Sequence, residues 1–267
     1  MIRRGAILLA LCLSPTAAAA QDRPPERPED TAADPAGAPA PAEEPQAEPV
    51  AVPVPEPVVE SSPMFGPPPP PVWWLLREDD GDFASCLRTL SARGAVFSEQ
   101  PPITDPDDRD CGIARPIRVE RILPGLALEG GAVMRCDTAL ALEGWARAFL
   151  QPAAAMLPGR PRVTALRLGT TYDCRPRVGT GEDRPKLSEH ALGNAIDIAG
   201  FVLDKGEALA VQPRLDTGDM AEAFQRTARA AGCLFFTTVL GPGSNDAHDD
   251  HLHLDIAARQ GGWRLCQ

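Results

Sequence analysis

The sequence of 267 residues lacks an excess of basic side chains, a long apolar run and closely spaced cysteine pairs. With 26 Lys and Arg against 37 Asp and Glu, nothing indicates a basic surface, so nucleic acid is not an expected partner. The apolar run at residues 6–13 is too short to cross a bilayer about 30 Å thick, and we expect no transmembrane segment in the mature chain. The absence of any C-x-x-C pair argues against a cysteine-rich zinc site.

Residues 1–20 have the pattern of a secretory signal peptide. Arg3 and Arg4 precede the apolar run, and small residues lead to an A-x-A-like cleavage site before Gln21. We therefore expect secretion across the inner membrane, most simply into the periplasm. Cys12 lies in the run, but Leu11 stands where a lipoprotein signal needs a small residue, so lipid anchoring is not expected.

Residues 21–71 form a linker with almost no large apolar side chains. They contain 17 of the 30 prolines, ten acidic residues and only two arginines. Such a stretch buries too little apolar surface to offset the entropy of ordering, so a disordered, extended tether is predicted. The tether offers a place where an envelope partner can bind.

The remaining residues, 72–267, are predicted to fold as one domain with three disulfides. An even number of cysteines in an exported chain indicates a disulfide framework; the six are Cys86, Cys111, Cys136, Cys174, Cys233 and Cys266. Sequence alone allows fifteen pairings of six cysteines. We take sequential closure, 86–111, 136–174 and 233–266, as the expectation.

The apolar patterns predict helices mixed with strands. Helices are expected at 82–93, from a cap at Asp137 up to Pro152, and at 220–231. Strands are expected at 118–123, 132–136, 163–171, 194–203, 234–240 and 252–256, the first two bracketing a turn at Gly130 and Gly131. Because the order shows no βαβ rhythm, we predict an α+β domain whose central antiparallel sheet is flanked by helices.

All four histidines lie in two short segments, SEHALGNAIDIAGF (188–201) and HDDHLHLD (248–255). On a strand at 252–256, leucine and isoleucine side chains would face the core, whereas His251, His253 and Asp255 would share the other face. Burying two unpaired imidazoles is costly, so a metal or a catalytic role is favoured there. Surface histidines and a loose metal-scavenging patch are the alternatives.

His190 and Asp197 can share a metal only if the chain reverses between them. Seven extended residues would span about 23 Å, and Gly193-Asn194 is a suitable place for a reversal. Two imidazoles and one carboxylate would leave a zinc ion with an open coordination position, which is typical of catalytic zinc. We expect one zinc ion per domain.

These residues resemble known motifs. Five positions match S-x-H-x-x-G-x-A-x-D of the LAS metallopeptidases (lysostaphin, D-Ala-D-Ala metallopeptidases, sonic hedgehog): Ser188, His190, Gly193, Ala195 and Asp197. The run H-x-x-H-x-H at 248–253 is similar to that of penicillin-insensitive murein endopeptidases. With the Pro-rich leader, both segments resemble the bacterial extensin-like protein C-terminal family over most of 72–267. The LAS resemblance is specific only over about 168–255.

The resemblance implies roles for individual residues. The zinc ligands would be His190, Asp197 and His253. The general base would be His251, as in murein endopeptidases, or Asp250, which stands where the dipeptidase branch has a longer glutamate. His248 would donate to the oxyanion, and Arg175 would orient the substrate; Glu189 and Asp255 are candidate partners for imidazole N–H groups.

The implied activity is that of an exported zinc metallopeptidase. Its substrate would be peptidoglycan, cleaved at D,D or L,D amide bonds of stem peptides or cross-links. A non-catalytic envelope or peptidoglycan-binding module that retains a zinc site is the alternative, as sonic hedgehog illustrates for the LAS fold. A metal-buffering periplasmic protein would instead bind several ions weakly.

Overall fold

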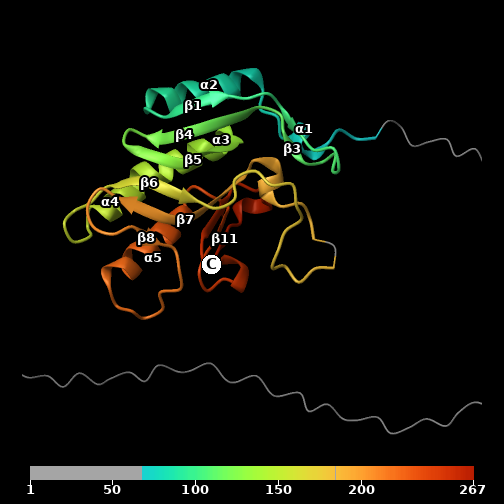
Figure 1. Cartoon of the computed structure of the whole chain (residues 1–267). Helices are drawn as coiled ribbons and strands as arrows, with labels where there is room; N and C mark the ends of the chain where they lie inside the picture. Colours follow the sequence, from blue (N-terminus) through green and yellow to red (C-terminus); the bar gives the residue numbers. More distant parts are fainter. Residues whose placement is uncertain (1–67, 184) are drawn as a thin grey trace, which may run out of the picture. The chain divides into compact units, whose positions relative to one another are not determined.

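The computed structural model of the protein describes residues 68–183 and 185–267 (Figure 1). The expected signal peptide, Cys12 and residues 21–67 of the expected linker lie outside the described residues. Within the described ranges, no helix has both the length and the hydropathy needed to cross a membrane.

A nine-stranded sheet forms the centre of the fold. Its path contains β1 (Val96–Glu99), β4 (Pro116–Leu123), β5 (Leu126–Arg135), β6 (Val163–Leu168), β7 (Ala195–Leu203), β10 (Leu252–Asp255), β9 (Thr238–Leu240) and β11 (Leu265–Cys266), and β8 (Leu209–Ala210) pairs with β7. Neighbours are antiparallel except in the pairs β5–β6 and β9–β11. The predicted α+β class with a central, mostly antiparallel sheet is confirmed. Two short strands, β2 (Ile103–Thr104) and β3 (Gly112–Ile113), pair separately.

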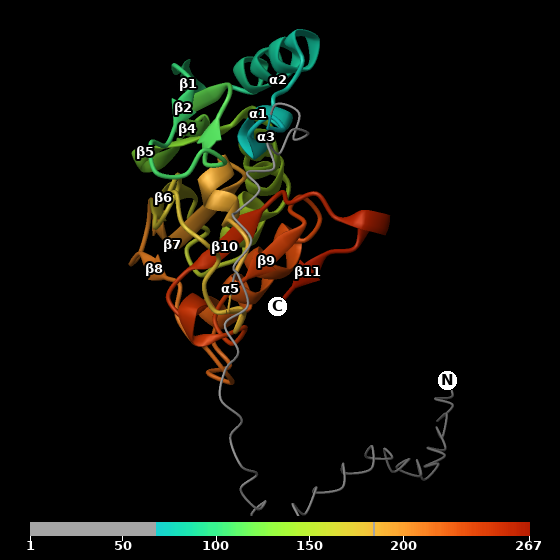
Figure 2. The same ribbon diagram turned by 90° about the vertical axis from the view of Figure 1, so that its right-hand side faces the viewer.

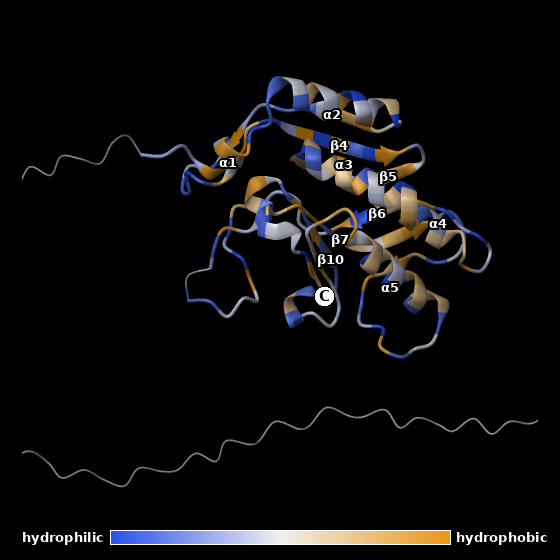
Figure 3. Ribbon diagram, turned by 180° about the vertical axis from the view of Figure 1, so that it is seen from behind, coloured by the Kyte–Doolittle hydropathy of each residue, from blue (hydrophilic) through white to orange (hydrophobic). Residues whose placement is uncertain are grey.

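Helices connect and cover the strands (Figure 1). The α-helices are α1 (Val72–Leu75), α2 (Asp80–Ala92), α3 (Cys136–Trp145), α4 (Gln151–Ala154) and α5 (Met220–Gly232), and a π turn, η1 (Ala146–Leu150), joins α3 to α4. Short 3-10 turns are η2 (Glu189–Leu192), η3 (Asp246–His248) and η4 (Gln260–Gly262). Hydrophilic and hydrophobic residues alternate along α2 and α5 (Figure 3), as expected for helices with one buried face.

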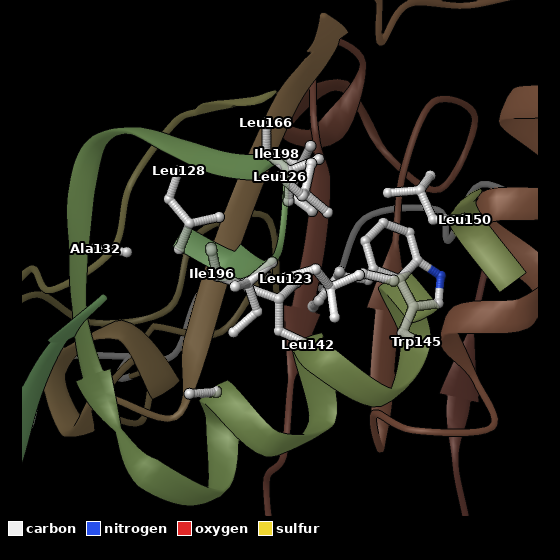
Figure 4. Close-up of a cluster of buried hydrophobic side chains, with 14 of the residues drawn as sticks. Leu123, Leu126, Leu128, Ala132, Leu142, Trp145, Leu150, Leu166, Ile196 and Ile198 are labelled. Atoms are coloured by element: carbon white, nitrogen blue, oxygen red, sulfur yellow. The ribbon is translucent and has the colours of Figure 1, made fainter. Parts of the chain in front are cut away.

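The main core lies between the sheet and the segment α3–η1–α4, which forms the crossover between the parallel strands β5 and β6. Trp145 is fully buried and donates its indole N–H to the carbonyl of Ala228 in α5 (2.9 Å). Leu142 of α3 and Ile196 and Ile198 of β7 belong to the same cluster (Figure 4). Their burial fixes which face of β7 points to the core.

Three local predictions are wrong. Gly130 and Gly131 lie inside β5, with positive φ at an irregularity in its pairing with β4, and the hairpin turns instead at Pro124–Gly125. Asp137 lies in the first turn of α3 and is not its cap. The helical segment also continues past Pro152, which occupies the first turn of α4, where a missing N–H costs least.

The disulfides connect segments that lie far apart in the sequence. Cys86 of α2 bonds Cys136 at the start of α3, and a second bond joins Cys111 to Cys174. The expected pairs 86–111 and 136–174 are therefore wrong, because α2 packs against α3 and brings their cysteines together. The third expected bond, Cys233–Cys266, is confirmed. Three disulfides are compatible with an extracellular or periplasmic protein.

The first described residues contact the domain. The backbone N–H of Val72 donates to Asp110 (3.0 Å), and the Trp73 indole donates to the carbonyl of Arg109 (3.1 Å). The Arg109 side chain in turn donates to the carbonyl of Pro69. Trp74 is half exposed. The contacts of the domain thus begin within the stretch 69–73.

Candidate metal centre

The centre is built on two neighbouring strands. In the antiparallel pair β7–β10, His253 lies directly opposite Asp197, and Figure 2 shows these strands side by side. The flanking residues Leu252 and Leu254 are fully buried in the core. Because side chains alternate along a strand, His253 and Asp197 extend together from the opposite face. The predicted division of the HLHLD segment between two faces is confirmed.

A tight reversal brings His190 to the same place. The Ser188 hydroxyl accepts from the backbone N–H of His190 (3.4 Å) at the start of η2, and Gly193 ends this turn with φ = 67°. A Cβ at Gly193 would lie 2.4 Å from the Ile113 side chain, so both the backbone angle and the space require glycine. The Gly193 carbonyl accepts from the buried Thr138 hydroxyl (2.9 Å). The predicted reversal is confirmed.

Three buried donor atoms converge where these segments meet. His190 Nε2 lies 3.1 Å from His253 Nδ1, and Asp197 Oδ1 lies 3.2 Å from the first and 3.0 Å from the second. Ligand atoms bound to one tetrahedral zinc ion are about 3.3–3.5 Å apart, given metal–ligand distances of about 2.0–2.2 Å. The three side chains therefore have the spacing and the donor chemistry of ligands to a single metal ion.

The outer nitrogen of each imidazole is already bound. His190 Nδ1 donates to the carbonyl of Thr171 (2.8 Å), and His253 Nε2 donates to Asp255 Oδ2 (3.0 Å). When the rings are neutral, these bonds fix the tautomer of each and leave the lone pair of its inner nitrogen facing Asp197. Glu189, the other expected partner of an imidazole, instead binds Arg177 (2.8 Å) and the side-chain amide of Asn194 (2.8 Å).

In the metal-free protein, the group formed by His190, Asp197 and His253 retains a proton. Burial alone would raise the pKa of Asp197, but hydrogen bonds with His190 and His253 outweigh it and hold that pKa well below its usual range. Burial opposes a charge on His253, yet its hydrogen bonds to Asp197 and Asp255 raise its pKa to about 9. Three acceptor atoms this close need a cation between them, and a metal ion can take the place of the proton.

His251 and Asp250 lie next to the three donors as a pair. His251 Nε2 is 3.7 Å from Asp197 Oδ1, while its Nδ1 is 2.7 Å from Asp250 Oδ1. The Asp250 side chain is 91% exposed, so its carboxylate contacts the outer side of His251. Of the two candidate bases, His251 is the one that has a ring nitrogen, Nε2, close to the converging donors.

His248, the expected oxyanion donor, is buried. Its ring centre lies 5.2 Å from that of His251 and 5.7 Å from that of His253. His248 Nδ1 donates to Asn245 Oδ1 (2.6 Å), and burial followed by the neighbouring histidines lowers its pKa to about 4. The neutral ring therefore has a lone pair at Nε2, and oxyanion donation from that atom would need a cationic imidazole.

A family model described as "Extensin-like protein C-terminus" matches residues 84–267, which include the six disulfide-bonded cysteines and every residue of this centre. The chain belongs to the extensin-like protein C-terminus family. No curated protein and no solved structure matches it.

A pocket of about 220 Å³ in the extensin-like domain opens onto the centre. Asp197, His248, His251 and His253 line it. Arg175, the expected substrate-orienting residue, also lines it and is paired with Asp173 (2.9 Å).

Sequence reasoning missed several residues of this extensin-like centre. Arg177 and Arg259 both line the pocket, and Thr171 and Asn245 hold His190 and His248. Of these four residues, Arg177 is the one that the sequence could have indicated, because it lies two residues after the candidate Arg175. The Thr171 carbonyl belongs to the backbone and leaves no side-chain signal, and Arg259 reaches the pocket only through the path of the C-terminal segment.

Proposed function

We propose that this extensin-like domain is an exported zinc metallopeptidase that hydrolyses amide bonds in peptidoglycan stem peptides or cross-links. The observation that carries the proposal is the convergence of His190 Nε2, Asp197 Oδ1 and His253 Nδ1 within 3.2 Å of one another at a pocket. Two imidazoles and one carboxylate are a ligand set of catalytic zinc, because they leave a coordination position open.

When bound, zinc supplies Lewis acidity that polarises an amide carbonyl and eases deprotonation of water. His251 is the general base in this proposal, since its Nε2 is near the ligands and Asp250 holds its Nδ1–H. His251 takes a proton from the attacking water and passes it to the nitrogen of the leaving amine. Asp250 is then a positioning residue, and the hydrogen bonds to Thr171 and Asp255 keep the two ligand rings in place.

Peptidoglycan as the substrate rests on the expected export of the chain and on its motif resemblance to murein endopeptidases and D-Ala-D-Ala metallopeptidases. The three disulfides agree with an oxidising compartment, where peptidoglycan lies. The cleaved bond would be a D,D or L,D amide of a stem peptide or a cross-link.

The test is the metal content of the purified mature chain, followed by digestion of peptidoglycan with mass analysis of the products. We expect one zinc ion in the wild type and in His251→Gln, and none in His253→Ala. New stem-peptide fragments should form with the wild type alone. His251→Gln serves as the matched control, because it alters a neighbouring imidazole that is not a proposed ligand.

The other outcomes separate the alternatives. One tightly bound zinc without fragments would favour the envelope-binding module, and several weakly bound ions would favour metal buffering. Absence of stoichiometric zinc from protein whose three disulfides are intact would overturn the zinc site itself.

A further inference from the structure

Arg259 differs from the other two arginines of the pocket in its charge environment. Arg175 is paired with Asp173 (2.9 Å) and Arg177 with Glu189 (2.8 Å). Within residues 68–183 and 185–267, no carboxylate lies within 4.0 Å of the Arg259 guanidinium. The pocket therefore contains one cationic group whose charge is not balanced by a described neighbour.

The Arg259 side chain is nevertheless held in place. Its Nη2 donates to the Thr238 hydroxyl (2.6 Å), and its guanidinium stacks on the Trp263 ring at 4.8 Å. The strand that follows contributes Leu265 to the pocket wall, and the Cys233–Cys266 disulfide ties this strand to the end of α5. A preorganised guanidinium loses less entropy when it binds a ligand.

Part of the hydrogen-bonding capacity of this guanidinium is unused. Arg259 Nε is buried and has no partner in the described part of the chain. Leaving a charged donor partly desolvated and unpaired is unfavourable, and an anion in the pocket would remove that cost. A carboxylate suits this site, because its two oxygens match the parallel N–H groups of a guanidinium.

Arg259 is also connected to the metal centre. Thr238, whose hydroxyl accepts from Arg259, lies directly opposite Asp255 in the β9–β10 pair, and Asp255 accepts from His253 Nε2 (3.0 Å). The residue that Arg259 binds is thus the strand neighbour of the residue that holds a proposed ligand, and all four residues line the same pocket. An anionic group bound to Arg259 would lie near an amide that reaches the metal centre.

We infer that Arg259 is a specificity-determining residue that binds a free carboxylate of the substrate. The substrate class would then be peptides with a free carboxylate close to the cleaved amide, in preference to peptides amidated there. This inference rests on the proposed function, because a role in substrate choice presupposes a peptidase. The selectivity for a carboxylate can nevertheless be measured without hydrolysis.

The experiment compares binding of N-acetyl-D-alanyl-D-alanine and of its C-terminal carboxamide to the zinc-loaded mature chain by calorimetry. All variants carry His251→Gln to prevent turnover. We expect at least tenfold preference for the acid, loss of that preference in Arg259→Gln with unchanged binding of the amide, and partial recovery in Arg259→Lys. Arg264→Gln is the matched control, since Arg264 belongs to the same segment and binds the carbonyl of Phe236 (2.6 Å).

The inference is overturned if Arg259→Gln keeps the preference, if it weakens acid and amide equally, or if the parent protein does not prefer the acid. Peptidoglycan digestion by the protein with an intact His251 is scored separately. Carboxylate selectivity without digestion would retain the role of Arg259 and remove the peptidase. Digestion without carboxylate selectivity would retain the peptidase and remove the role of Arg259.

Discussion

His253 of β10 lies directly opposite Asp197 of β7, and their facing atoms, Nδ1 and Oδ1, are 3.0 Å apart. A slip of one residue in this strand pairing would turn His253 toward the core and bring a leucine to the centre. The burial of Leu252 and Leu254 opposes such a slip, because both side chains would leave the core. Hydrophobic packing on one face of the sheet thus holds the proposed ligands on the other.

Zinc binding should release a proton between pH 7 and about 9. In the metal-free protein the pKa of His253 is raised to about 9, so the ring is protonated below that pH and must lose its proton to bind a metal. The apparent dissociation constant should therefore fall about tenfold per pH unit up to about pH 9 and then level off. Competition with a chelator of known affinity measures this, and an affinity independent of pH between 7 and 8.5 would contradict it.

Asp255→Asn should weaken zinc binding about 10–100-fold, the usual cost of losing a carboxylate that orients a ligand histidine. The reason is the hydrogen bond of 3.0 Å from His253 Nε2 to Asp255. Asp249→Asn is the control, because Asp249 accepts from a backbone N–H, that of Gly243 (3.1 Å), and not from an imidazole. Equal zinc affinities of the two variants in chelator competition would argue against a role for Asp255.

Gly193→Ala should destabilise the metal-free protein more than Gly218→Ala. Both glycines have nearly the same backbone angle, φ of 67° and 66°, so each substitution costs roughly 1–2 kcal/mol for the left-handed conformation. Only at Gly193 would the new Cβ meet Ile113, and overpacking adds about 1–3 kcal/mol. Denaturant unfolding of chelator-treated protein gives both values, and equal losses would show that the close approach to Ile113 is unimportant.

Peptide mapping of the non-reduced protein should find Cys86–Cys136 and Cys111–Cys174, and no Cys86–Cys111 peptide. The Cys86–Cys136 bond closes a loop with a sequence separation of 50 residues, which corresponds to about 4 kcal/mol of unfolding free energy in the chain-entropy account. Cys86→Ser/Cys136→Ser should therefore show a clear loss in denaturant unfolding. A linked Cys86–Cys111 peptide would contradict the observed packing of α2 on α3.

Much of the centre was predictable from short stretches of sequence. Alternation along HLHLD assigns two faces within five residues, and glycine at position 193 indicates a reversal because few other residues adopt that backbone angle. The α+β class follows from apolar periodicity in the same way. Each of these inferences depends on interactions between residues that are close in the chain.

The sequence by itself therefore determined the local elements and the two histidine segments, whereas the tertiary structure decided their partners. Adjacent glycines look alike in a turn and in a strand irregularity, so only strand pairing placed the hairpin at Pro124–Gly125. The disulfide pairing and the arrival of Arg259 at the pocket likewise depend on which distant segments pack together. That packing is the arrangement of lowest free energy, to which many weak contacts over the whole chain contribute. It cannot be predicted from any short stretch of sequence.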